Sequence, residues 1–262
     1  MTHPHQRRRI RRVLPEAGIS ESGNIRSLHL DSPTVQSSMN LDDPSELVLS
    51  YSRAMMAWLM FVPTPRHITH IGLGGGSFAR WIDAFLPDTA QTAVEINPQV
   101  IQIARMLFEL PFEGEKFEIL EADGAEYVKT LNGGTDVLLV DGFDGEQIID
   151  DLVGEDFFQD CFRALSADGV FAANWWSGDK RYELFKERLA RSFGGRLIAV
   201  PAESHGNVAV LAFKGEAETA LDTLKRRAAK LQEQYRLDFP RMLADIKAAN
   251  PHNNKKLRFQ AA

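Results

Sequence analysis

Polar residues that could do chemistry follow four apolar runs between residues 68 and 140. They are the glycine-rich loop 72–77, Glu95, Asp123 with Gly124, and Asp141 with Asp144. Short apolar runs bounded by turn residues are typical of strands in a parallel sheet, and ligands of such sheets bind beyond the carboxyl ends of the strands. We therefore expect these residues to gather at one edge of a single sheet.

The first of these features predicts a nucleoside site. Its glycines are Gly72, Gly74, Gly75 and Gly76. Glycine permits positive φ and lets a ligand approach the backbone closely. Glu95 follows the loop by about 20 residues, at the end of the next predicted strand, and a carboxylate there can accept two hydrogen bonds from a ribose diol. The alternative is a turn that only joins a strand to a helix.

The aspartates at the next two strand ends each allow two interpretations. Asp123 could accept a hydrogen bond from an exocyclic amine of a base, with Gly124 permitting close approach, and it could also cap the following helix. Asp141 and Asp144 lie three residues apart in a turn that contains glycine, so both carboxylates could face one cavity. There they could take a proton from an amine or hold a cationic substrate. Their alternative role is to form the turn itself.

Strand and helix patterns alternate along most of the chain and predict a Rossmann-like α/β fold. The sheet should be mostly parallel with helices on both faces, closed by a last strand pair that could be antiparallel. Two short apolar segments, 25–30 and 35–39, predict an N-terminal β-hairpin, and an amphipathic helix follows over 47–61. The predicted divisions are a disordered basic arm over 1–20, the hairpin and linking helix over 21–62, the Rossmann-like catalytic domain over 63–247 and a polar tail over 248–262.

Composition limits the partners and the compartment. The chain of 262 residues is 44% hydrophobic and 25% charged with a net charge of −6, which disfavours nucleic acid as the main partner. No run approaches the ~18 apolar residues of a membrane span, and no apolar signal region follows the basic N-terminus. Cys161 is the single cysteine, which fits a reducing compartment and predicts a cytoplasmic protein. Its amphipathic surroundings favour a buried side chain over a nucleophile.

Three further features keep two interpretations each. The arginine-rich arm over residues 1–20 could bind an anionic partner, although a disordered tail in solvent is the favoured interpretation. His205 could act as an acid or base, or be an ordinary loop histidine at the surface. Trp175 and Trp176 could line a pocket, or one of them could pack under a helix.

In order and spacing, these motifs resemble the spermidine synthase family of polyamine aminopropyltransferases. The motifs are Gly-Leu-Gly-Gly-Gly-Ser at 72–77, Val94-Glu95, Ala122-Asp123-Gly124-Ala125 and Val140-Asp141-Gly142-Phe143-Asp144. The stretch 23–30 with Gln36 resembles the N-terminal hairpin of the family, and Leu49-Ser50-Tyr51 resembles its substrate-binding tyrosine segment. The resemblance covers about residues 20–213. It implies a small N-terminal β region and a catalytic domain like that of class I methyltransferases.

The resemblance implies transfer of an aminopropyl group from decarboxylated S-adenosylmethionine to a diamine such as putrescine. Glu95 and the glycine loop would hold the ribose end of the donor, and Asp123 with Gly124 would hold its adenine. Asp141 would accept a proton from the attacking amine, while Asp144, Tyr51 and Gln36 would bind the diamine. The donor is a co-substrate, so we expect no tightly bound cofactor and no metal. A homodimer, assembled through the N-terminal hairpins, is also implied.

Departures from the family pattern leave other functions open. Gly75 stands where the family loop has an aspartate that binds the aminopropyl amine, Phe143 replaces a small residue, and Glu203 replaces a tyrosine. A different acceptor, a different sulfonium donor or methyl transfer from S-adenosylmethionine on the same fold therefore remain alternatives, as does a non-catalytic nucleoside-binding protein. A nicotinamide oxidoreductase is disfavoured because the loop departs from the dinucleotide fingerprint.

Overall fold

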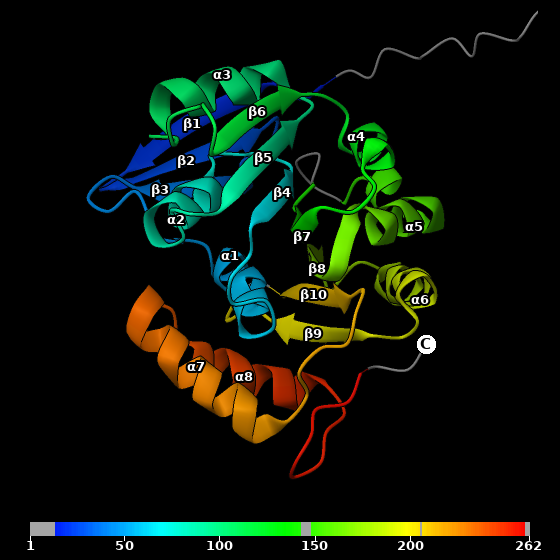
Figure 1. Ribbon diagram of the computed structural model, residues 1–262. Helices are drawn as coiled ribbons and strands as arrows, with labels where there is room; N and C mark the ends of the chain where they lie inside the picture. The colour runs from blue at the N-terminus through cyan, green and yellow to red at the C-terminus, as the bar shows by residue number, and fades with distance from the viewer. Residues whose placement is uncertain (1–13, 143–147, 205, 260–262) are drawn as a thin grey trace, which may run out of the picture.

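The computed structural model describes residues 14–142, 148–204 and 206–259. They form a seven-stranded sheet in the order β6-β5-β4-β7-β8-β10-β9 (Figure 1). The strands are β4 (His67–Ile71), β5 (Ala90–Glu95), β6 (Phe117–Glu121), β7 (Thr135–Val140), β8 (Leu165–Trp176), β9 (Leu197–Pro201) and β10 (Asn207–Phe213). The pairs among β4 to β8 are parallel, and β10 is antiparallel to both β8 and β9. The predicted sheet, with its antiparallel closing pair, is confirmed.

The strand order places a crevice at the centre of the sheet. From β4 the chain moves outward through β5 to β6, and then returns to place β7 on the other side of β4. At such a reversal the connections leave in opposite directions, which opens a crevice beyond the carboxyl ends of the two central strands. The loops after β4 and β7 therefore face each other across this crevice.

Helices cover both faces of the sheet. They are α1 (Ser50–Met55), α2 (Ser77–Phe85), α3 (Pro98–Leu107), α4 (Gly124–Thr130), α5 (Glu155–Ala164), α6 (Tyr182–Phe193), α7 (Leu221–Tyr235) and α8 (Phe239–Ala249). Along β7, Val137 and Leu139 belong to the apolar core shared with α1, α2, α7 and α8, whereas Leu138 and Val140 belong to the core shared with α4, α5 and α6. Alternate side chains of a strand point to opposite faces, so a strand covered on both sides is apolar throughout. None of the helices in the described part of the chain is long and apolar enough to cross a bilayer.

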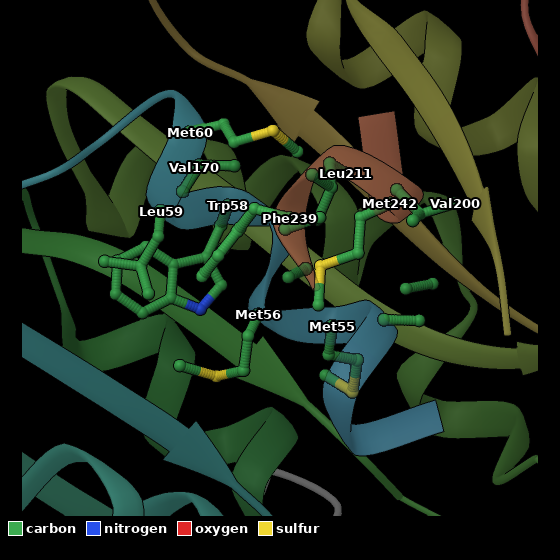
Figure 2. Packing of buried hydrophobic residues seen from close by; sticks show 14 of the residues in the cluster. Met55, Met56, Trp58, Leu59, Met60, Val170, Val200, Leu211, Phe239 and Met242 are labelled. Atoms are coloured by element: carbon green, nitrogen blue, oxygen red, sulfur yellow. The ribbon is translucent and has the colours of Figure 1, made fainter. Parts of the chain in front are cut away.

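The predicted helix over 47–61 is shorter in the structure and changes type. It consists of α1 and a 3-10 helix, η1 (Met56–Met60), and every side chain of η1 is fully buried. Figure 2 shows Met55, Met56 and Trp58 packed among sheet residues and Phe239 and Met242 of α8. Core residues of the sheet and of α2, α7 and α8 surround this short helix, so no face of it is left for solvent. The sequence predicted a helix with one apolar face, whereas the structure buries η1 on all sides.

A second sheet of three strands precedes α1. It is an antiparallel meander of β1 (Ala17–Ser22), β2 (Ile25–Leu30) and β3 (Val35–Asn40). The predicted hairpin corresponds to β2 and β3, whereas β1 occupies residues that were assigned to the arm and the start of the next segment. Strand β1 lies at the edge of the small sheet, and most of its side chains are exposed. Because it buries few side chains, its sequence lacks the regular apolar alternation by which a half-buried strand is recognised. Leu28 and Met39 pack against Val100 and Phe108, which places the small sheet over α3.

Candidate active site

A cavity of about 820 Å³ lies at the crevice and is closed on one side by the three-stranded sheet. Its volume is in the usual range for small-molecule sites. The predicted residues in its wall are Gln36, Tyr51, Gly72, Gly74, Glu95, Asp123, Gly124 and Asp141. Polar residues from four separate strand ends are therefore brought together, as their positions after the apolar runs predicted. Asp144 and the neighbouring Phe143 lie outside the described residues.

Gly72 lets the ends of the two central strands approach each other. Its φ is +95°, and a Cβ on it would overlap the carbonyl oxygen of Asp141. The amide of Asp141 donates to the carbonyl oxygen of Ile71 at 2.9 Å, which ties β7 to β4 at the same level. Only glycine meets both the backbone angle and the space at this position.

The other two predicted loop glycines do not belong to the cavity wall. A Cβ on Gly75 would lie 2.6 Å from the ring of Phe108 and 2.9 Å from the hydroxyl of Ser37. Gly76 has a φ of +74° and precedes α2 as its N-cap. Position 75 therefore faces the small sheet, and a carboxylate there would need Phe108 and Ser37 to move.

Glu95 points back to the glycine loop. Its Oε2 accepts from the amide of Leu73 at 3.0 Å, and its Oε1 accepts from the amide of Asn97 at 2.9 Å. Burial raises the pKa of Glu95, while backbone N–H groups that include those of Leu73 and Asn97 lower it. Each carboxylate oxygen has a further lone pair, so Glu95 can also accept from a pair of ligand hydroxyls.

Asp123 is the N-cap of α4. Its Oδ1 accepts from the amides of Ala125 at 2.9 Å and Glu126 at 3.2 Å. The helix-capping interpretation is thus confirmed, and the residue also lines the cavity. A Cβ on the adjacent Gly124 would overlap the side chain of Ile71, so this glycine allows α4 to begin close to β4.

Asp141 is held by a chain of amide side chains that the sequence did not single out. Its Oδ1 accepts from Asn174 Nδ2 at 3.1 Å, and Asn174 Oδ1 accepts from Asn207 Nδ2 at 3.0 Å. Asn174 and Asn207 lie near the paired ends of β8 and β10, and both line the cavity. Asn174 follows an apolar run like the other strand-end residues, and that position was the signal that could have identified it.

Tyr51 completes the surroundings of Asp141. Its hydroxyl lies 3.0 Å from the carbonyl oxygen of Gln36 and is also close to the carboxyl group of Asp141, so its single hydrogen can be donated to either acceptor. Burial raises the pKa of Asp141 to about 6, although hydrogen bonds from Asn174 and Tyr51 oppose that rise. Burial, together with the charge of Asp141, raises the pKa of Tyr51 well above its usual value. Near neutral pH the site thus contains an ionised but poorly solvated carboxylate beside a neutral phenol.

The two tryptophans have different positions. Trp176 is half exposed and lines the cavity, whereas Trp175 is buried against Tyr182 and Phe185 of α6. Trp176 therefore lines the cavity and Trp175 packs under a helix, which were the two positions predicted for this pair. Cys161 lies on the buried face of α5 in the core, as expected. His205 lies outside the described residues, and within the described ranges no cluster of three or more histidine, cysteine or acidic side chains could hold a metal ion.

Comparisons with known proteins agree with this geometry. A family model described as the spermine/spermidine synthase domain matches residues 49–185. Proteins named polyamine aminopropyltransferase are 69% identical over 97% of both chains in Neisseria meningitidis serogroup A, and 58% identical over 95% of this chain and 96% of the relative in Chromobacterium violaceum.

Solved structures share the fold at low sequence identity. A spermidine synthase in complex with the transition-state analogue AdoDATO has a TM-score of 0.64 at 22% identity, over 88% of this chain and 84% of that one. A human methyltransferase-like protein 13 in complex with SAH has a TM-score of 0.61 at 22% identity, over 71% of this chain and 89% of that one. The fold is thus shared with methyltransferases, whereas the sequence similarity is specific, and the chain belongs to the spermine/spermidine synthase family.

Proposed function

We propose that this chain transfers an aminopropyl group from decarboxylated S-adenosylmethionine to a diamine such as putrescine. The observation that carries the proposal is the environment of Asp141: a buried carboxylate with a pKa of about 6, beside Tyr51 and facing a cavity whose other end suits a nucleoside. The names of the relatives, at up to 69% identity over nearly the whole chain, support the same reaction.

The nucleoside half of the cavity is proposed to hold the donor. Glu95, held by the backbone beside the glycine loop, would accept from the two ribose hydroxyls. Asp123 and Gly124 would contact the adenine, since both line the cavity at the next strand end. Gly72 and Gly74 would let the nucleoside lie against the backbone.

The amine half is proposed to activate the acceptor. An ammonium group gives one proton to the carboxylate of Asp141, and its nitrogen then attacks the aminopropyl carbon bonded to the sulfonium. A nitrogen–carbon bond forms, the carbon–sulfur bond breaks, and its electron pair stays on sulfur as neutral methylthioadenosine. The proton on Asp141 passes to solvent. Tyr51 and Gln36 would orient the amine, and alignment supplies much of the acceleration because the sulfonium is already a good leaving group.

Product mass tests the reaction directly. The protein is incubated with decarboxylated S-adenosylmethionine and putrescine, and the acceptor should gain one aminopropyl group. Asp141→Asn should lose about 100-fold or more in kcat, because general-base catalysis contributes at least that much. Asp222→Asn, which changes an exposed aspartate on α7, is the matched control and should keep full activity. An active Asp141→Asn variant would contradict the role of this carboxylate.

Methyl transfer is the second candidate, because position 75 has no carboxylate to select the aminopropyl amine and packs against Phe108 and Ser37 without lining the cavity itself. The same assay with S-adenosylmethionine separates the two reactions by the mass added to the acceptor. Calorimetry with decarboxylated S-adenosylmethionine, S-adenosylmethionine and methylthioadenosine adds a binding test, since a chain that binds none of the three cannot catalyse either reaction.

We further propose that the chain forms a homodimer through the three-stranded sheet, and acts in a reducing compartment such as the cytoplasm. Strand β1 supports the first idea, because it is an edge strand with exposed residues and an edge presents unpaired backbone groups. The single, buried Cys161 suits the second. Sedimentation of the full chain at several concentrations tests the dimer, and a monomer throughout would contradict it.

A further inference from the structure

A second, smaller cavity of about 230 Å³ adjoins the first. The two cavities share Ser50 and Arg53, both on α1. The other charged residues of the second cavity are Glu203, Arg236, Asp238, Arg241 and Asp245. They come from the β9–β10 connection and from the region around the start of α8, so this cavity lies between elements that the proposed donor site does not use.

An ion pair lies at the boundary of the two cavities, because Arg53 lines both of them and its partner Glu203 lines the second. Arg53 Nη2 donates to Glu203 Oε2 at 2.9 Å, and Arg53 Nη1 donates to the carbonyl oxygens of Leu47 and Val48, each at 2.8 Å. The hydroxyls of Ser50 and Ser204 lie 2.9 Å apart beside this pair. These three hydrogen bonds hold the guanidinium group of Arg53 in place. The ion pair between Arg53 and Glu203 thus joins α1 to the β9–β10 connection.

This wall lies at the proposed amine end of the main cavity. Tyr51, which is within reach of Asp141, is adjacent to Ser50 on α1. Asn207, whose side chain supports Asn174 and through it Asp141, begins β10 three residues after Ser204. Arg53 lines the same cavity as Asp141, so it is available to the second nitrogen of a linear diamine whose first nitrogen lies at Asp141.

We propose that the Arg53–Glu203 ion pair is the wall that limits the length of the acceptor amine, which rests on the proposed function. A distal ammonium meets the guanidinium of Arg53, and Glu203 offsets the repulsion while the pair stays closed. A longer amine can reach further only by entering the second cavity. That cavity has three carboxylates, Glu203, Asp238 and Asp245, against three arginines, so removing Arg53 opens the wall and leaves an excess of negative charge.

The test measures amine binding in the presence of methylthioadenosine by calorimetry, with putrescine, cadaverine and spermidine as probes. In Arg53→Ala, the affinity for spermidine relative to putrescine should rise by about tenfold, since a repulsive charge and a steric barrier are both lost. In Glu203→Gln, the guanidinium keeps its charge without its partner, so the affinity for putrescine should fall by about threefold. Arg191→Ala is the matched control, because Arg191 pairs with Glu155 at 3.0 Å on exposed parts of α6 and α5.

Each outcome decides the proposal. Unchanged length preference in an Arg53→Ala protein that melts normally and binds methylthioadenosine overturns it, and so does a wild-type protein that binds no amine. If Arg53→Ala does not fold, Glu203→Gln alone decides, and unchanged putrescine affinity in that variant rejects the wall. Aminopropyl transfer is assayed in parallel: a wild-type protein without transfer refutes the proposed function, while an altered length preference in the variants still supports the wall.

Discussion

At the scale of single residues, the proposed chemistry depends on how one carboxylate is balanced between burial and hydrogen bonding. Burial raises the pKa of Asp141 to about 6, and Asn174 and Tyr51 keep it from rising further. A carboxylate in this range is still ionised near neutral pH, and it is a stronger base than an exposed aspartate. This ionised carboxylate lowers the free energy of unfolding, because burying a charge away from water is unfavourable.

The first prediction is that Asp141→Asn changes activity and stability in opposite directions. The pKa of Asp141 is higher in the folded chain than the ordinary 3.8, so the folded chain binds more protons between these values and its free energy of unfolding decreases as pH rises through them. Above pH 7 the neutral amide avoids this cost and should raise the free energy of unfolding by on the order of 3 kcal/mol. Denaturant unfolding at pH 8 measures it, and a less stable variant would contradict the prediction.

The second prediction concerns the pH profile of kcat/KM. Activity should fall as pH decreases below about 6, since Asp141 must be ionised to accept a proton. In Asn174→Ala the carboxylate loses a donor that favours its charged form, so this acidic limb should move up by about one pH unit. Asn132→Ala, at an exposed loop position, is the control. An acidic limb that stays in place would show that Asn174 does not tune Asp141.

At the scale of elements, the glycine loop is shaped from both of its ends. Gly72 has positive φ and touches the backbone of β7, while Arg80 of α2 donates to the carbonyl oxygens of Gly75, Phe108 and Pro44. Burial lowers the pKa of Arg80 to about 10, which leaves it charged near neutral pH. A buried guanidinium with these acceptors connects the loop to the end of α3 and to the segment before α1. The loop is therefore preorganised by its neighbours as well as by its own glycines.

The third prediction separates backbone strain from steric overlap at this loop. Gly72→Ala should reduce the free energy of unfolding by about 2–4 kcal/mol, because the added Cβ overlaps the Asp141 carbonyl and the φ of +95° is unfavourable. Gly133→Ala has a comparable φ of +78° but open space around its Cβ, so it should cost only about 1 kcal/mol. Equal losses in chemical denaturation would mean that the contact with β7 contributes nothing.

At the scale of the whole molecule, two sheets enclose the cavity. The central sheet contributes the strand-end carboxylates, and the small sheet contributes Leu28, Gln36 and Ser37 to the opposite wall. The small sheet is held over α3 by a separate apolar cluster that contains Met39 and Phe108. Ligand binding should therefore depend on the packing between the sheets, even at residues that do not reach the cavity.

The fourth prediction tests this dependence with two buried methionines. Met39→Ala should reduce the free energy of unfolding by about 2–4 kcal/mol and weaken methylthioadenosine binding by about threefold or more, because the wall formed by β3 shifts. Met60→Ala removes an equally buried side chain from the core under the other end of the sheet. It should cost a similar free energy without changing the dissociation constant. Equal binding by both variants would show that the small sheet does not shape the site.

The sequence by itself determined the order of strands and helices along the chain and the strand ends that carry polar residues. These features are local: an apolar run followed by Glu95 or Asp141 can be recognised without knowing what lies nearby. The polar strand β1, the 3-10 helix η1 and the direction of position 75 could not be predicted, because each depends on what packs against it.

Only the tertiary structure brought together side chains that are distant in sequence. The hydrogen bond between Asn174 and Asp141 and the ion pair between Arg53 and Glu203 join residues 33 and 150 positions apart. No periodicity or spacing encodes such contacts, since they arise from the order in which the strands pair and from the connections that follow. The polar residues at the strand ends could therefore be recognised from the sequence, whereas the hydrogen bonds to Asp141 and the contact between Arg53 and Glu203 were decided by the fold.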